Sequence, residues 1–188
     1  MKILGIIGGM SPESTATYYT EINRLVNQKK GGNISAPIVM VSVEFEEIVQ
    51  CQKQSEWQRA GEILAEAGKK LEMIGAEGIV LATNTMHKVA PQIEQAISIP
   101  FLHILDATAD AIKSRGLNKV ALLGTKFTMS DNFYRDGLQQ RGIMPIVPID
   151  ETQNEIHRII FDELCVGKFL PQSKAFYLDT IEFLRKQG

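Results

Sequence analysis

The sequence predicts an α/β protein built from parallel sheets with crossover helices. Short apolar runs alternate with segments of helical periodicity along all 188 residues, a pattern typical of strands joined by helices in a parallel sheet. Several runs are apolar at successive positions, as expected of strands that are buried on both faces. The predicted strands span residues 2–8, 37–43, 78–82, 101–104, 119–124 and 144–148.

The helices predicted between these strands have recognisable ends. The first begins with Ser11 as its N-cap and Pro12 at its first helical position, and both residues favour a helix start. A second helix spans residues 56–74, a later one ends at Gly167, and the last begins near Pro171. Helical spacing predicts buried faces in the first and last of these: Tyr18, Ile22, Leu25 and Val26, and Phe176, Tyr177, Thr180, Ile181 and Leu184.

Composition excludes several classes of protein. The chain is 44% hydrophobic and 22% charged, with a net charge of −2 and no basic block, which argues against a nucleic-acid partner. No apolar run approaches the roughly 18 residues that cross a bilayer, and the apolar N-terminus is too short for a signal peptide. Cys51, Cys165 and the three histidines show no metal-ligand spacing. We therefore expect no metal, no membrane partner and a cytoplasmic location.

A weak internal repeat predicts two similar halves. Residues 2–8 resemble residues 119–124 when Gly8 and Gly124 are aligned, and each segment leads into a helix start containing Ser or Thr. We therefore divide the chain into a first α/β half, residues 1–115, and a second, residues 116–188. The strand ending at Ala82 would have its counterpart beyond Gly188, so we expect the second half to be incomplete in this chain.

The first candidate site is the segment Gly8-Gly9-Met10-Ser11, where a predicted strand passes into a helix. Ligands of open parallel sheets bind beyond the carboxyl ends of the strands. Two glycines allow a tight turn, and N–H groups at a helix start suit an anion. The segment is neither a P-loop nor a dinucleotide fingerprint. An ordinary strand–helix turn remains the alternative.

The second candidate is Thr83-Asn84-Thr85, which directly follows an apolar strand. One polar residue is enough to cap a helix, so three in succession favour a small polar ligand. Backbone N–H groups here could bind a carboxylate while Asn84 orients an ammonium or carboxylate. The alternative is that these three polar residues only cap the helix and bind no ligand.

Residues 8–15 and 83–88 together resemble the aspartate/glutamate racemase family of cofactor-independent amino-acid racemases. Further similarity at residues 51–52, 100–104, 121–125 and 161–167 extends it over nearly the whole chain. The resemblance implies two α/β halves related by pseudo-two-fold symmetry, facing each other across a cleft. It also implies an aspartate- or glutamate-type substrate, no cofactor, and a homodimer, which is common among these relatives.

The resemblance further implies a substrate-binding set, comprising Met10, Ser11, Gln52, Thr83, Asn84 and Thr85. Lys168, just after Gly167, could pair with a distal carboxylate of the substrate, and compensation of a helix dipole is the alternative. In the family one cysteine thiolate removes the α-proton and a second thiol returns a proton on the opposite face. Ala82 stands at the position of the first cysteine, and the motif of the second would lie beyond Gly188. Cys51 and Cys165 lie away from strand ends and are not expected to substitute, and His87 is expected to pack or cap.

These departures predict a racemase-type protein that is inactive as given. Three explanations of Ala82 stay open: an engineered substitution, a decayed copy of the gene, or a protein that kept ligand binding and lost catalysis. The alternative function is a non-catalytic protein that binds an amino acid or a dicarboxylate. A different carbanion reaction on a malonate- or maleate-like acid is a third reading, which the run from Thr83 to Lys88 disfavours.

Overall fold

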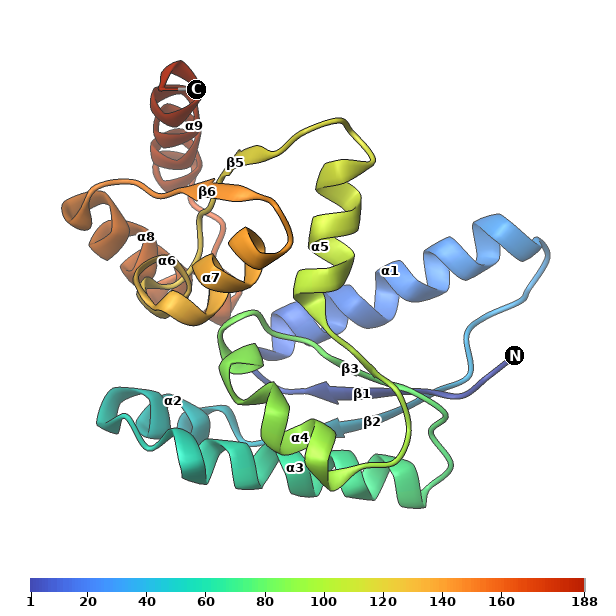
Figure 1. The fold of residues 1–188 in the computed structure, drawn as a ribbon. Coiled ribbons are helices and arrows are strands. Elements are labelled where there is room, and N and C mark those ends of the chain that lie inside the picture. Colours follow the sequence, from blue (N-terminus) through green and yellow to red (C-terminus); the bar gives the residue numbers. More distant parts are fainter. Residues whose placement is uncertain (188) are drawn as a thin grey trace. The chain divides into compact units, whose positions relative to one another are not determined.

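The computed structural model describes residues 1–187 and divides into two compact units (Figure 1). The first unit covers Met1–Ile104, and the second begins at Leu105. Both contain parallel strands flanked by helices, so the α/β class predicted from the sequence is confirmed. The division at residues 115 and 116 stays a prediction. None of the helices within residues 1–187 combines the length and apolar character needed to cross a membrane.

A four-stranded parallel sheet forms the centre of the first unit, in the order β2-β1-β3-β4. Gly5 of β1 lies opposite Val39 of β2 on one side and Ile79 of β3 on the other. The carboxyl end of β1 is therefore flanked by the carboxyl ends of β2 and β3, at the edge where such sheets bind ligands. The strands are β1 (Leu4–Gly8), β2 (Ile38–Ser42), β3 (Ile79–Leu81) and β4 (Phe101–Leu102).

Helices on both sides cover this sheet, with α3 and α4 below it and α1 above it in the view of Figure 1. Their bounds are α1 (Pro12–Lys30), α2 (Phe45–Gln54), α3 (Trp57–Met73), the 3₁₀ helix η1 (Thr85–Val89) and α4 (Ala90–Ala96). The hydrophobic core joins the strands to α2, α3, η1 and α4. Its large members include Ile7, Met10, Ile48, Leu64, Leu71, Ile79, Leu81, Met86 and Ile93.

The second unit contains a two-stranded parallel sheet of β5 (Lys119–Ala121) and β6 (Met144–Ile146). Its helices are α5 (Ile104–Lys113), α6 (Lys126–Ser130), α7 (Asn132–Gln140), α8 (Asp150–Asp162), the 3₁₀ helix η2 (Leu164–Val166) and α9 (Pro171–Lys186). Its buried apolar side chains include Leu105, Met129, Tyr134, Leu138, Ile143, Ile156, Ile159 and Leu184. All six predicted strands are therefore present, each shorter than its predicted range.

The predicted buried faces of the first and last helices are partly wrong. Leu25 of α1 is 54% exposed, and Ile181 of α9 is 45% exposed. Helix α9 instead buries Ser173, Thr180 and Leu184, which share one face because seven residues make about two turns. Ile181 is turned about 100° away from Thr180. Two small polar residues on the buried face made that face hard to recognise from hydrophobicity alone.

The turn between β1 and α1 explains why two glycines stand in succession. A Cβ at Gly8 would lie 2.4 Å from Cγ2 of Thr15, in the first turn of α1. Gly9 has φ +98°, and a Cβ there would lie 2.3 Å from the carbonyl oxygen of Val43. Both glycines therefore let parts of the chain approach each other, rather than making room for a ligand.

The second unit repeats part of this arrangement. A Cβ at Gly124 would lie 3.0 Å from Cβ of Thr128, much as Gly8 faces Thr15. Thr125 caps α6 by accepting a hydrogen bond from the N–H of Thr128. Ser11 caps α1 in the same way, but the two caps stand three residues after Gly8 and one residue after Gly124, so the duplication stays a prediction.

Replacing Gly9 with alanine should destabilise the first unit, because the new Cβ meets main chain and the positive φ disfavours any side chain. We expect a loss of about 1–3 kcal/mol in the free energy of unfolding, measured by urea denaturation. Gly32→Ala is the matched control, since Gly32 also has positive φ but its Cβ would meet nothing within 4 Å. Equal losses in the two variants would show that the contact with Val43 does not matter.

Candidate functional site

The first turn of α1 is bonded directly to the segment that follows β3. Ser14 Oγ donates to the carbonyl oxygen of Ala82 at 3.0 Å and is also 3.0 Å from the carbonyl oxygen of Ser11. Thr15 Oγ1 accepts from the N–H of Gly9 at 2.8 Å and donates to the Ser11 carbonyl at 2.9 Å. The two segments singled out in the sequence therefore lie side by side at the carboxyl edge of the sheet.

Ser11 and Met10 are both buried at this edge, with different surroundings. Ser11 is 4% exposed, and its hydroxyl oxygen accepts from the N–H of Ser14 at 3.4 Å as the N-cap of α1. The Met10 side chain is 5% exposed and belongs to the hydrophobic core. Residue 10 therefore offers a ligand its main chain rather than its side chain.

Ala82, Thr83, Asn84 and Thr85 form the segment after β3. The N–H of Ala82 donates to the Ile7 carbonyl at 2.9 Å, and the alanine side chain is fully buried. Thr85 is 4% exposed, Thr83 is half-buried and Asn84 is exposed. The three polar side chains thus differ in access to solvent.

The helix expected to start at this segment is the 3₁₀ helix η1, five residues long, and not an α-helix. So short a helix contributes only a small dipole, and the binding of a carboxylate by the N–H groups of Thr83–Thr85 stays a prediction. The long helix at this edge is α1, with 19 residues.

His87 connects this segment to Ile104, just after β4. Its Nδ1 lies 2.7 Å from the Thr83 carbonyl oxygen, and its Nε2 accepts from the N–H of Ile104 at 3.2 Å. These contacts require a neutral ring protonated on Nδ1, because the carbonyl can only accept and the amide can only donate. Burial, together with repulsion from nearby His103, lowers the pKa of His87 to about 4. The ring is therefore a structural brace.

Gln52 reaches the same segment from α2. It is 5% exposed, and its Nε2 donates to Sδ of Met86 at 3.0 Å. Its Oε1 is buried and has no hydrogen-bond partner among the described residues. Gln52 therefore presents a hydrogen-bond acceptor, whereas an amide that grips a carboxylate would present its nitrogen.

The two cysteines have different surroundings. Cys51 is 3% exposed within the hydrophobic core, and burial raises the pKa of its thiol, which disfavours the reactive thiolate. Cys165 lies in η2 and is half-buried. Lys168 belongs to the second unit, where its side chain is exposed and its N–H donates to the Glu163 carbonyl at 2.9 Å.

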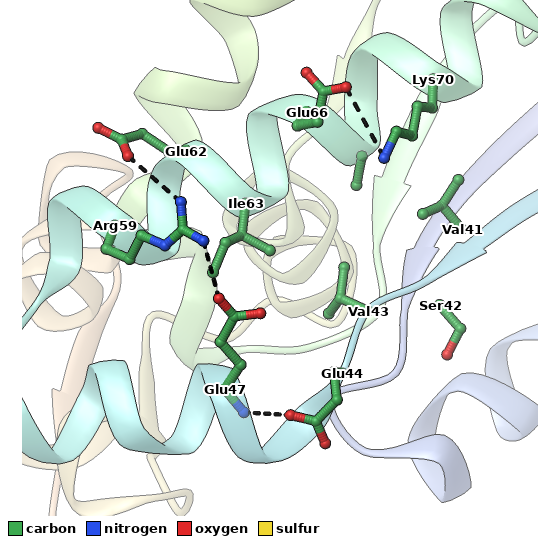
Figure 2. A pocket seen from close by; sticks show the side chains of 11 residues that line it. Val41, Ser42, Val43, Glu44, Glu47, Arg59, Glu62, Ile63, Glu66 and Lys70 are labelled. Carbon is green, nitrogen blue, oxygen red and sulfur yellow. Dashed lines mark hydrogen bonds and ion pairs between the residues drawn. The ribbon is translucent and has the colours of Figure 1, made fainter.

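A hollow of about 360 Å³ lies elsewhere in the first unit, between the end of β2 and helices α2 and α3 (Figure 2). Its charged groups are paired: Arg59 lies 3.1 Å from Glu47, and Lys70 lies 3.9 Å from Glu66. These side chains are about half exposed, so each pair contributes little. None of the predicted site residues lines it, and we assign it no small-molecule ligand. Residues 1–187 contain no group of three or more His, Cys, Asp or Glu side chains placed to hold a metal ion.

The brace made by His87 predicts a loss of stability in mild acid. Its pKa lies below the unfolded value of 6.5, so folding favours the neutral ring. The stabilisation is complete above pH 6.5 and disappears as the pH falls towards 4. The pKa difference corresponds to about 3 kcal/mol. Urea denaturation between pH 7.5 and 4 should show this fall, and His87→Gln should show a flatter profile.

His103→Gln is the control for that experiment. It removes the neighbouring ring that repels a charged His87, but leaves the burial that is the larger cause of the lowered pKa. Most of the pH dependence should therefore survive in this variant. A profile that is equally steep in His87→Gln and the unmodified protein would contradict the assignment.

Comparisons with known proteins agree with this architecture. A model of the Asp/Glu/Hydantoin racemase family matches residues 7–188. A crystal structure of a candidate Asp/Glu racemase from Yersinia pestis is 49% identical with a TM-score of 0.90, over all of this chain and 82% of that one. That of an aspartate racemase homologue from Pyrococcus horikoshii OT3 is 38% identical with a TM-score of 0.82, over all of this chain and 81% of that one.

A curated relative is also an amino-acid racemase. The broad specificity amino-acid racemase RacX of Bacillus subtilis (strain 168) is 26% identical over 160 residues, which are 84% of this chain and 69% of that protein. The family match begins at Ile7, one residue before the Gly8–Ser11 turn, and includes the Thr83–Thr85 segment. The chain belongs to the Asp/Glu/Hydantoin racemase family, whose racemases are isomerases.

Proposed function

We propose that the carboxyl edge of β1 and β3 binds an acidic amino acid of the aspartate or glutamate type, and that residue 82 takes no part in proton transfer. The observation that carries this proposal is the position of Ala82. Its carbonyl is bonded to the first turn of α1 through Ser14, and its side chain is a buried methyl group. The family resemblance implies that the first catalytic cysteine would stand at this position.

The groups around Ala82 suit an acid ligand. Helix α1 is 19 residues long, and its N-terminal end, capped by Ser11, favours negative charge. Hydroxyl groups of Thr83 and Thr85 and the amide of Asn84 supply further hydrogen-bonding capacity. We assign Met10 a main-chain contact with the ligand.

The chemistry of racemisation explains why binding and turnover separate here. Inversion at an α-carbon requires one group to remove a proton and another to return a proton to the opposite face. A positioned acid or base typically contributes about 10²–10⁴ to the rate, and a methyl group can do neither. We therefore propose a two-base, cofactor-independent racemase architecture in which the residue-82 base is missing.

Isothermal titration calorimetry with the L- and D-forms of aspartate and glutamate tests the binding proposal. We expect heat from at least one of the four ligands, and chiral chromatography after prolonged incubation should find no conversion between enantiomers. Absence of binding by all four would overturn the proposed function. Measurable conversion would overturn the claim that the site lacks a competent base.

Restoring a thiol tests whether residue 82 faces the α-carbon. In deuterium oxide, Ala82→Cys should exchange the α-proton of the bound amino acid for deuterium, because removal and return on one face need only one base. Ala82→Ser is the matched control, since its hydroxyl is far less acidic than a thiol. Proton NMR of the α-position reports the exchange. Binding without exchange in Ala82→Cys would show that residue 82 does not face the α-carbon.

A further inference from the structure

One edge of the first sheet is a five-residue strand with a neighbour on one side only. The order β2-β1-β3-β4 leaves the outer side of β2 unpaired by any strand within residues 1–187. No residue of β2 is buried, whereas four of the five residues of β1 are. Sheet edges are usually protected by charge, proline, a bulge or shortness. The opposite edge strand, β4, has only two residues, but β2 reads Ile-Val-Met-Val-Ser and carries no charge.

The hydrogen bonds of β2 show which of its residues point outward. The Pro37 carbonyl accepts from the N–H of Leu4. At the other end of the strand, the N–H of Val43 donates to the Gly8 carbonyl. Main-chain groups alternate in direction along a strand, so the odd-numbered residues of this segment bond to β1. The outward N–H and C=O groups therefore belong to Ile38, Met40 and Ser42.

The hollow beside β2 has an apolar floor next to this edge (Figure 2). Val41 and Val43 of β2 line it together with Ile63 and Ala67 of α3. Successive side chains of a strand point to opposite faces. Every second side chain of a strand added to β2 would therefore lie on the α3 side and meet these apolar groups. Strand addition at a sheet edge, with pockets for alternate side chains, is a recurring mode of peptide recognition.

The rim of the hollow is acidic. Four carboxylates line it against two cations, which leaves a net charge of −2; they are Glu44, Glu47, Glu62 and Glu66 against Arg59 and Lys70. Both cations are already in ion pairs, Arg59 with Glu47 at 3.1 Å and Lys70 with Glu66 at 3.9 Å. The charge left for a partner is therefore negative, and it is complemented by lysine or arginine.

We propose that the β2 edge and the hollow bind an extended segment of a partner protein, in which apolar side chains are flanked by lysine or arginine. The main chain of the segment pairs with the outward groups of β2. Its apolar side chains lie in the hollow, and its basic side chains reach the acidic rim. This inference does not rest on the proposed function, because it concerns residues outside the proposed ligand site.

Two other occupants fit this surface less well. A second copy of this chain, paired through β2 about a two-fold axis, would bring two acidic rims together. A helix has no free main-chain groups along its length, so it would leave the outward groups of β2 unpaired. An extended basic segment satisfies both the main chain and the charge.

A designed peptide tests the proposal. In Lys-Thr-Val-Thr-Val-Thr-Lys, one face of the strand carries two valines flanked by two lysines. Fluorescence anisotropy of the labelled peptide should show saturable binding that weakens as salt is added. The same peptide with glutamate in place of both lysines should bind at least about 5-fold more weakly. Equal binding of the two peptides, or no saturable binding of the lysine peptide up to about 1 mM, would overturn the proposal.

Met40→Pro tests pairing at the edge. It removes an outward N–H but spares the bonds from β2 to β1, and proline is tolerated on edge strands. We expect it to weaken the lysine peptide at least about 10-fold. Met40→Ala is the matched control, because it keeps the N–H and should bind within about 2-fold of the unmodified protein. Equal affinities in the two variants would overturn strand addition.

A second arm does not depend on the folding of a variant. Two forms of the lysine peptide carry methyl groups on the amide nitrogens of the valines or of the threonines. Alternate N–H groups of a strand point to opposite edges, so at least one of the two forms should lose binding to the unmodified protein. Full binding by both forms would contradict strand addition.

Glu62→Gln tests the acidic rim. It should weaken the lysine peptide about 2- to 5-fold without weakening the glutamate peptide. Glu21→Gln is its control, because Glu21 is also an exposed carboxylate paired with an arginine, but it lies on α1 and does not line the hollow. Equal effects of the two variants would overturn the role of the rim. Sedimentation velocity tests self-association: a dimer that Met40→Pro converts to a monomer would replace the proposed partner with a second copy.

Discussion

The hydrogen bond from the Ser14 hydroxyl to the Ala82 carbonyl is the interaction on which the proposed site depends. It joins the first turn of α1 to the segment after β3 at 3.0 Å, although the two residues are far apart in sequence. Thr15 packs directly over Gly8, which holds the start of α1 close to the strand ends. The glycine pair, the N-cap and the polar segment therefore act as one structural unit.

The other side of that unit is held by groups that carry no charge. Neutral His87 bridges the Thr83 carbonyl and the N–H of Ile104, and Met86 packs in the core against Gln52. Charged braces would have to be desolvated at this depth, at a large cost in free energy. A neutral imidazole and an amide hold the segment equally firmly. Unlike charged side chains, they add no electrostatic potential that would compete with an ionic ligand.

Much of this architecture could be predicted from the sequence, for a specific physical reason. The strands produce short apolar runs, which are nearly fully buried in β1 and β3, and Ser11-Pro12 indicates a helix start, so these elements are recognisable in the sequence. The short 3₁₀ helix at Thr85 could not be distinguished from an α-helix, because its few residues carry no periodic signal. The partners of Gly9 and His87 depend on Val43 and Ile104, which no local pattern connects to them.

The way the backbone of residue 82 is held explains how binding and catalysis can be separated in this fold. Its N–H donates to the Ile7 carbonyl and its carbonyl accepts from Ser14, so both main-chain groups are fixed whichever side chain is present. Replacing a thiol with a methyl group therefore removes the proton-transfer group without releasing Thr83, Asn84 or Thr85 from their positions. Main-chain contacts at Ala82 and the neutral ring of His87 hold these segments in place, so under the proposed function recognition of the ligand would not require chemistry at residue 82.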